Sequence, residues 1–281
     1  MDPFSIDAYS PAEVAKRVEQ ASLSKCTNDP FRVLALAVLA GAFIALGAAF
    51  YTLVIHEPGM MPLGVLKWLG GLAFCLGLVL VVVAGAELFT GNNLLVMAFV
   101  DGKISGRQLL NNWLIVYFGN FVGALGILVL IALSGLWWQG DGALAAKTVA
   151  IAESKVNLTF WEAFSRGVLC NLLVCLAIWL TMAGRSVTDK ILAVLLPISA
   201  FVALGFEHSV ANMFVIPAGM LASNMQAWQG MGLSVTENLN ISGFLLGNLL
   251  PVTLGNLVGG SILVGLFYWF IYLRDNRRND D

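Results

Sequence analysis

Apolar and polar positions alternate in long blocks along this chain. Six apolar segments stand out, at about 32–55, 66–99, 108–136, 160–182, 190–223 and 244–272. Each is close to or above the roughly 20 residues that a helix needs to cross a bilayer. The second and fifth are too long for one ordinary crossing, and both carry polar residues near the middle. A tilted helix would explain the length but not the polar cluster, so we expect both helices to be broken.

Composition agrees with a membrane protein. Of 281 residues, 59% are hydrophobic and 11% are charged, whereas soluble domains carry about 25% charged residues. A net charge of −2 without a basic run argues against a nucleic-acid partner. The four cysteines form no C-x-x-C pair and are best explained as buried small residues. Two histidines without a ligand cluster predict no metal, and no sequence feature calls for a cofactor.

The polarity of the chain predicts three regions. Residues 1–29 form an N-terminal segment, 30–273 the membrane domain, and 274–281 a C-terminal tail. The N-terminus carries Asp2 and Asp7 and lacks the basic residues that precede the apolar core of a signal peptide. We therefore expect no cleaved signal peptide.

The N-terminal segment should contain one helix. Ser10-Pro11-Ala12-Glu13 has the form of a capping box, and Val14 and Val18 follow at helical spacing. One interpretation is an amphipathic helix on the membrane face, and another is a movable plug over a pore mouth.

Lysine and arginine counts predict the orientation. Six crossings place both termini on one side, and that side carries eleven basic residues against three. Under the positive-inside rule both termini are cytoplasmic. Arg166 is not counted because it falls inside the fourth apolar segment. The eleven are Lys16, Arg17, Lys25, Arg32, Lys103, Arg107, Arg185, Lys190, Arg274, Arg277 and Arg278, and the three are Lys67, Lys147 and Lys155.

An internal repeat relates the two halves. The segments 85–92 and 205–212 both read G-x-E-x-x-x-x-N, and 119–123 matches 255–259 as G-N-x-V-G. Three crossings per repeat is an odd number, so the halves must be inserted with opposite polarity. Inverted repeats with paired broken helices place the site between the halves, near the midplane. The glycines of 119–123 and 255–259 should also allow close helix packing.

Glu87 and Glu207 fall inside these motifs. An ionised carboxylate there costs roughly 2.5–3.5 kcal/mol unless it is paired. They could serve as cation ligands or proton carriers, or they could accept hydrogen bonds from amides freed by the helix break. Their symmetric occurrence favours the structural role. Asn92 and Asn212 either clamp the breaks or bond across helices.

Three further polar residues lie at the breaks. Thr90 is placed to cap the half-helix starting at Gly91, and Ser209 is placed to do the same in the other half. Half-helix N-termini favour an anion. His208 is either a satisfied core residue or a group that bonds an anion or lends it a proton, which would ease its passage through an apolar constriction.

Several long segments resemble the formate–nitrite transporter family, most closely its formate channels. The first signature is similar to 82–91, VVAGAELFTG, and the second to 167–177, GVLCNLLVCLA. The segments 205–213 and 185–190 match as well. The resemblance covers essentially the whole chain and implies an aquaporin-like protomer, five of which form a ring with one pore each.

The resemblance also implies roles for residues of the pore. The cytoplasmic constriction would comprise Leu88, Thr90 and Val174, and the periplasmic one Phe74, Leu78 and Phe201. His208 and Thr90 would be bonded across the chamber between them, Lys155 and Asn171 would favour anions, and the N-terminal helix would close the cytoplasmic mouth.

We therefore expect a passive, bidirectional channel for formate and similar small anions in the inner membrane, and not an enzyme. Lipid and further copies of the chain are the expected partners. A nitrite or hydrosulfide channel of the same family is the first alternative. A proton or cation conductor that uses Glu87 and Glu207 is the second. An intramembrane hydrolase is disfavoured because Ser209 and His208 are adjacent, and adjacent helical residues point about 100° apart.

Overall fold

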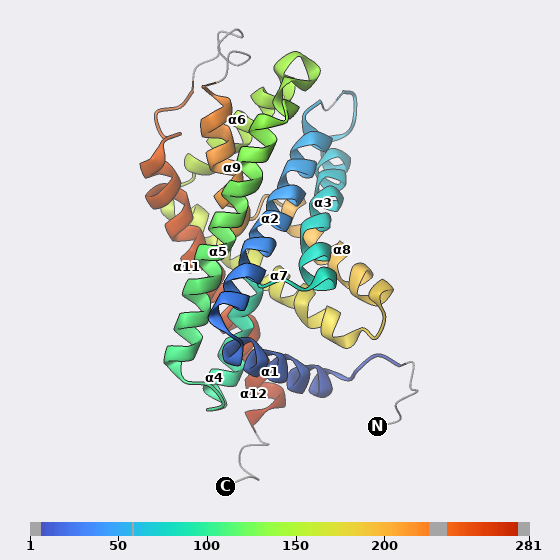
Figure 1. The fold of residues 1–281 in the computed structure, drawn as a ribbon. Helices are drawn as coiled ribbons and strands as arrows, with labels where there is room; N and C mark the ends of the chain where they lie inside the picture. Colours follow the sequence, from blue (N-terminus) through green and yellow to red (C-terminus); the bar gives the residue numbers. More distant parts are fainter. Residues whose placement is uncertain (1–6, 58, 225–234, 275–281) are drawn as a thin grey trace.

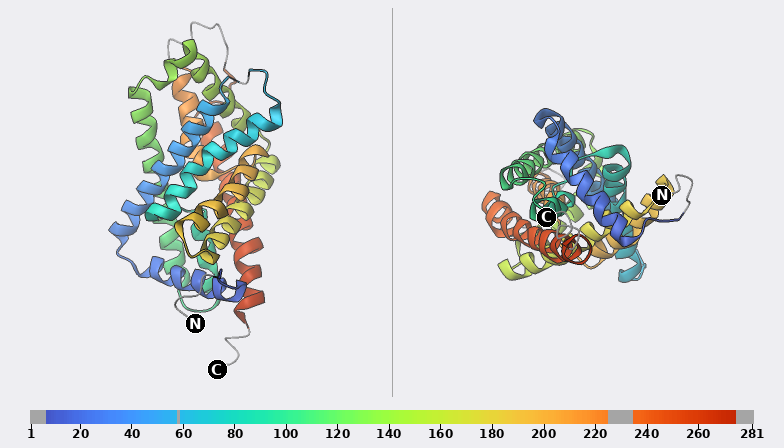
Figure 2. Two further views of the ribbon diagram at one scale, coloured as in Figure 1. Left: turned by 90° about the vertical axis from the view of Figure 1, so that its right-hand side faces the viewer. Right: turned by 90° about the horizontal axis from the view of Figure 1, so that it is seen from below.

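Helices run side by side along the length of the molecule, and α1 (Pro11–Thr27) lies across one end of them (Figure 1). The computed structural model describes residues 7–57, 59–224 and 235–274, and every regular element in these ranges is helical. α12 (Phe267–Tyr272) ends beside α1 (Figure 2). We call this the α1 end and the opposite one the α6 end. Of the expected tail 274–281, only Arg274 lies inside the described residues.

The first half of the chain builds the blue-to-green part of Figure 1. Its helices after α1 are α2 (Pro30–Ile55), α3 (Leu63–Leu80), the π-helix η1 (Val81–Gly85), the 3-10 helix η2 (Gly91–Leu95), α4 (Val96–Val100) and α5 (Gly106–Leu133). Side chains of Asp29 and Ser105 cap α2 and α5, because the first N–H groups of a helix have no partner within it.

The second half builds the green-to-red part. It contains the 3-10 helix η3 (Leu136–Gly142), α6 (Ala143–Val156), α7 (Phe160–Ala183), α8 (Val187–Ala203), α9 (Ser209–Ala222), the π-helix η4 (Gly243–Leu249), α11 (Leu250–Leu257), the π-helix η5 (Val258–Leu266) and α12. Thr159 and Ser186 close capping boxes at the starts of α7 and α8.

Within the described residues, five helical stretches are long and apolar enough to cross a membrane: Pro30–Ile55, Leu63–Gly85, Gly106–Leu133, Phe160–Ala183 and Gly243–Tyr272. The apolar segment 190–223 is instead divided between α8 and α9. The chain is thus an all-helical, multi-pass membrane protein, as its apolar blocks predict.

Residues 137–159, which lie between two of the expected apolar segments, include most of η3 and all of α6. Buried residues recur along α6 every three or four positions, as in Leu144, Thr148 and Ala152, and this face packs on α9. The lysines Lys147 and Lys155 lower the average hydropathy of the segment and concealed this period.

Glycines allow the closest helix contacts, as the G-N-x-V-G repeat predicts. A Cβ added to Gly123 of α5 would lie 1.9 Å from the Val38 carbonyl oxygen of α2. One added to Gly259 of η5 would lie 2.1 Å from the Val168 carbonyl oxygen of α7. Neither position has room for a side chain, so the two helix pairs approach backbone to backbone.

α1 packs on protein along its apolar face. The capping box of Ser10 and Glu13 is present. Val14 and Val18 are buried in a cluster with Leu94, Trp179 and Val264. α1 therefore covers the ends of α7, η2 and α12 and does not rest on lipid through this face.

Candidate permeation site

The helical backbone is interrupted after Gly85 and again around Gly205. Both glycines have positive φ angles, 80° and 73°, which residues with a Cβ adopt at a cost. No atom lies within 4 Å of an added Cβ at either position, so conformation and not space requires glycine. The residue after each glycine donates its N–H to the carbonyl five positions earlier, at 2.9 Å and 3.0 Å. This bond is that of a Schellman cap, and it ends each helix.

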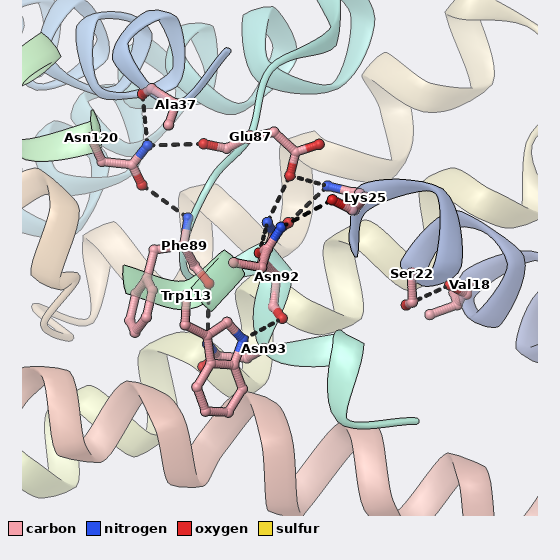
Figure 3. Close-up of polar contacts among 11 residues, drawn as sticks. Val18, Ser22, Lys25, Ala37, Glu87, Phe89, Asn92, Asn93, Trp113 and Asn120 are labelled. Carbon is pink, nitrogen blue, oxygen red and sulfur yellow. Dashed lines mark hydrogen bonds and ion pairs between the residues drawn. The ribbon is translucent and has the colours of Figure 1, made fainter. Parts of the chain in front are cut away.

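Asn120 of α5 binds the non-helical backbone that follows Gly85 (Figure 3). Its Nδ2 donates to the carbonyl oxygens of Ala37 and Glu87, at 2.8 Å and 2.9 Å. Its Oδ1 accepts the N–H of Phe89 at 2.9 Å. One buried amide thus supplies partners that a helix would otherwise supply.

Asn256 of α11 does the same for the second interruption. Its Nδ2 donates to the carbonyl oxygens of Gly167 and Glu207, at 2.8 Å and 3.0 Å, and its Oδ1 accepts the N–H of Ser209 at 2.9 Å. This asparagine falls in the G-N-x-V-G repeat, but no role was predicted for it. Both repeats have an asparagine at this place and both contain a helix break, and this correspondence could have indicated its function.

Glu87 forms a cluster with three other side chains (Figure 3). Lys25 Nζ lies 3.0 Å from Glu87 Oε2 and 2.7 Å from Asn92 Oδ1. Asn92 Nδ2 donates to the same carboxylate at 2.6 Å and to Asn112 Oδ1 at 2.9 Å. Asn112 in turn donates to the Lys25 carbonyl at 3.3 Å. Glu87 therefore has a cation and an amide as partners within the protein.

Glu207 stands in a matching cluster. Lys155 Nζ lies 2.8 Å from Glu207 Oε1, and Asn212 Nδ2 donates to Oε2 at 2.6 Å. Asn212 also donates to Asn248 Oδ1 at 2.7 Å, and Asn248 donates to the Lys155 carbonyl at 3.0 Å. Each asparagine of the motif thus contacts both its own glutamate and a second helix, so both suggested interactions occur together.

No site role was predicted for Lys25 from the sequence. It lies on α1, whereas Lys155, which the family resemblance did single out, lies on α6. Both lysines follow a serine and precede by four positions the residue that caps the next helix. That shared context was the signal that could have paired them.

Thr90 and His208 meet between the two breaks. Thr90 Oγ1 lies 2.9 Å from His208 Nε2. On the other side of the ring, Nδ1 accepts the N–H of Ala211 at 3.0 Å. A neutral imidazole that accepts at Nδ1 carries its proton on Nε2. His208 therefore donates to Thr90, whose own hydroxyl hydrogen stays available for another acceptor.

The capping expectations for Thr90 and Ser209 were wrong. Thr90 makes no side-chain cap at Gly91, because its hydroxyl is engaged by the imidazole. The N-cap of α9 is His208, one residue before Ser209. Ser209 Oγ is buried without a hydrogen-bond partner, and its N–H is bound by Asn256.

Asn171 of α7 fixes the backbone of Thr90. Its Nδ2 lies 3.2 Å from the Thr90 carbonyl, 2.7 Å from the Asn256 carbonyl and 2.8 Å from Asn93 Oδ1. Cys175 Sγ lies 3.3 Å from the same Thr90 carbonyl. These contacts tie the first break to the second half of the chain and hold the Thr90 hydroxyl toward His208.

Apolar side chains flank the Thr90–His208 pair. The ring of Phe201 stacks 6.0 Å from the His208 ring and meets Phe74 edge-on at 5.6 Å. All the residues expected in the two constrictions are buried in one apolar core: Leu88, Val174, Phe74, Leu78 and Phe201.

Two cavities approach this apolar core from opposite sides. The α1-end cavity, of about 320 Å³, is lined by Lys25, Glu87 and Leu88 among others. The α6-end cavity, of about 160 Å³, is lined by Lys155 and His208 among others. Leu88 lines the first cavity, whereas His208, Phe74 and Phe201 all line the second, and Thr90 contacts His208 between them.

This arrangement offers hydrogen-bond donors in a buried, largely apolar surrounding. The Thr90 hydroxyl can donate directly to an acceptor such as a small oxyanion, and the imidazole N–H can donate to one that takes the place of Thr90 Oγ1. Within the part of the chain that the structure describes, no group of three histidine, cysteine or carboxylate side chains is arranged to hold a metal ion.

The chain is similar to known channels and transporters. The family model for formate/nitrite transporters matches residues 12–270. The formate channel FocA of Escherichia coli K12 is 46% identical and aligns over 98% of both chains. A probable formate transporter of Methanothermobacter thermautotrophicus is 40% identical over 95% of this chain and 98% of its own.

Two solved structures are also similar. A pentameric formate channel with formate bound has a TM-score of 0.82 and 42% identity, over 87% of this chain and 98% of that one. An ion channel of the same family has a TM-score of 0.78 and 29% identity, over 92% and 98%. These relatives are described as channels or transporters and not as enzymes. The chain belongs to the formate/nitrite transporter family.

Proposed function

We propose that the protein is a passive, bidirectional channel for formate and similar small monovalent anions. One observation carries this proposal: a hydroxyl and an imidazole N–H face each other among apolar side chains, between two cavities that each contain a lysine–glutamate ion pair. The names of the relatives support formate as the anion, since both the FocA channel and the solved pentamer are described by it.

In the proposed route, an anion leaves one cavity, passes Leu88 on one side or Phe74 and Phe201 on the other, and binds between Thr90 and His208. The two donors replace part of its hydration shell. Val174 and Leu78 complete the apolar lining, and Asn171 acts as a positioning residue through the Thr90 carbonyl.

Proton exchange with His208 would neutralise the anion and ease its passage. The geometry favours hydrogen bonding over proton transfer, because a second proton on Nδ1 would displace the Ala211 N–H. It would also place a positive charge at the positive N-terminal end of α9, which is unfavourable.

The wider architecture is part of the same proposal. Two inverted repeats of three crossings, with breaks after Gly85 and Gly205, give an aquaporin-like protomer. The matched Glu87 and Glu207 clusters support this pairing. Five protomers would form a ring in the inner membrane, with the α1 end facing the cytoplasm as the distribution of basic residues predicts.

The alternatives are less well supported. A cation or proton conductor needs available carboxylates, whereas Glu87 and Glu207 are each engaged by a lysine and an asparagine. A hydrolase needs a nucleophile beside a base, and Ser209 Oγ has no hydrogen-bond partner. Nitrite and hydrosulfide stay possible substrates because both are small monovalent anions.

Flux into proteoliposomes tests the proposal. Formate, nitrite and hydrosulfide are each supplied outside protein-containing and protein-free vesicles over a series of external pH values. We expect protein-dependent formate flux down its gradient in either direction. Protein-dependent flux of potassium or protons alone, without formate movement, would overturn the proposal.

A further inference from the structure

The two cavities each contain a lysine–glutamate ion pair, but one of them is also lined by a further charged residue. The α1-end cavity contains the ion pair of Lys25 and Glu87, and the α6-end cavity that of Lys155 and Glu207. In each, a carboxylate compensates a lysine at 3.0 Å or less. Lys155 therefore adds little net positive potential of its own.

Arg166 of α7 is this further residue. Its backbone carbonyl accepts the N–H of Glu207 at 3.2 Å, and the carbonyl of Leu36 accepts the N–H of Glu87 at the same distance. The two residues thus occupy matching places. Leu36 lines the α1-end cavity, and Arg166 lines the α6-end cavity.

The guanidinium of Arg166 has no ion pair among the described residues. The carboxylate nearest along its own helix is Glu162, one turn earlier. Glu162 is exposed and is bound by Thr159 in the capping box of α7. The ionised groups lining the α6-end cavity are Lys155, Glu207 and Arg166, which sum to +1, whereas Lys25 and Glu87 sum to zero at the α1 end.

We propose that Arg166 makes the α6-end cavity a docking site for a small monovalent anion, so that this cavity fills at a lower anion concentration than the α1-end cavity. This inference rests on the proposed channel function and adds a specificity-determining residue to it. A unit charge acting through water over about 5 Å raises the local concentration of a monovalent anion about four-fold. Salt reduces this effect, because the screening length falls from about 10 Å at 0.1 M to about 3 Å at 1 M.

The test compares variants in vesicles of one orientation, selected through an affinity tag at the N-terminus. Formate flux is measured from each side over a series of formate concentrations up to saturation, in low and in high concentrations of an impermeant salt, and the half-saturating concentrations at the two ends are compared. Wild type is compared with Arg166→Leu, which copies the residue at the α1 end, and with Arg166→Lys, which keeps the charge. Lys67→Leu removes an exposed charge outside the cavity lining and serves as the matched control.

We expect Arg166→Leu to raise the half-saturating formate concentration at the α6 end about two- to four-fold at low salt, with little change at high salt. Arg166→Lys and Lys67→Leu should keep the wild-type ratio of the half-saturating concentrations at the two ends. Leu36→Arg should lower the half-saturating concentration at the α1 end by a similar factor. A wild-type channel that conducts formate, but whose Arg166→Leu variant keeps the same salt-dependent ratio, would overturn this inference and leave the channel function standing. Absence of formate flux in wild type would remove both.

Discussion

Thr90 and His208 lie 118 positions apart in the chain, yet Thr90 Oγ1 and His208 Nε2 are 2.9 Å apart. Each belongs to one of two otherwise matching breaks, and neither is repeated in the other break. Glutamate and asparagine recur and support the backbone, whereas the two unmatched residues form the contact at which we propose that an anion binds. The repeated groups are therefore scaffold, and the unmatched groups are where selectivity is expected.

His208 has two functions that substitution can separate. His208→Phe removes both the cap of α9 and the donor near the anion, while His208→Asn keeps a good cap and removes the imidazole. We expect both variants to lower formate flux about ten-fold or more, since a hydrogen bond to a charged group contributes about 1.5–3 kcal/mol. Only the phenylalanine variant should lower the thermal unfolding temperature, by the equivalent of about 1 kcal/mol.

Flux is measured in proteoliposomes and unfolding by the loss of the oligomer on heating. Wild-type flux with a wild-type pH profile in both variants would rule out the histidine role. Equal destabilisation of both variants would rule out the cap.

Much of this arrangement was foreseeable from local patterns. The long apolar blocks predict crossing helices, and G-x-E-x-x-x-x-N predicts where two of them stop, because φ > 0 at a glycine ends a helix. The side-chain partners were less accessible. Lys25 contacts Glu87 across 62 positions of the sequence, and Asn256 contacts Ser209 across 47. At such separations the spacing in the sequence does not indicate which side chains meet.

Single residues were misjudged where two roles compete for one group. Threonine and serine are good helix caps in general, but at Thr90 the hydroxyl is closer to an imidazole, and at Ser209 the preceding histidine takes the capping place. Arg166 was set aside as a residue inside an apolar segment. In the structure, Arg166 lines the α6-end cavity, and the apolar pattern of the sequence gives no sign of this cavity.

Asn256 should be a structural residue whose loss also damages the pore. Asn256→Leu leaves two buried carbonyl groups and the Ser209 N–H without their partner. Unsatisfied buried groups cost about 1–3 kcal/mol each, so we expect a clear fall in unfolding temperature and reduced flux. Asn120→Leu should cost a similar amount of stability because it makes the matching bonds.

Asn157→Leu is the control, since Asn157 is exposed and its side chain bonds to Thr236 and Asn238 near the surface. It should change stability by less than about 0.5 kcal/mol. A stability loss for Asn157→Leu as large as that for Asn256→Leu would contradict the proposed role of the buried amide.

Glu207→Gln separates an anion channel from a cation conductor. The amide keeps the shape and one acceptor oxygen for Asn212 but leaves Lys155 without its counter-charge. An anion channel should keep its reversal potential in a formate gradient, with fewer intact oligomers because a buried pair is broken. A cation conductor should lose its current altogether. Current–voltage curves in a planar bilayer, normalised to the amount of oligomer, distinguish these outcomes.

The docking of α1 should depend on pH through Glu19. This side chain is buried on α1 and pairs with Lys103, and Lys103 also pairs with Asp101, which accepts the indole N–H of Trp269 of α12. Burial raises the pKa of Glu19, and neighbouring Asp101 adds to this, while Lys103 opposes it. Burial also pushes the pKa of Asp101 upward, but hydrogen bonds from Trp269, Glu19 and Lys103 outweigh it and leave it lowered.

The docked state of α1 therefore binds a proton at Glu19 more readily than an undocked state would. The resulting stabilisation is complete below the ordinary carboxyl pKa and is lost as the pH rises through the raised one. We expect amide hydrogen exchange in α1, corrected for the intrinsic rate, to become faster over this interval. Glu19→Gln mimics the protonated form and should keep exchange slow and independent of pH, whereas Glu13→Gln, at an exposed cap, should keep the wild-type pH dependence. Loss of the pH dependence in Glu13→Gln but not in Glu19→Gln would assign the effect to the start of the helix and contradict the role of Glu19.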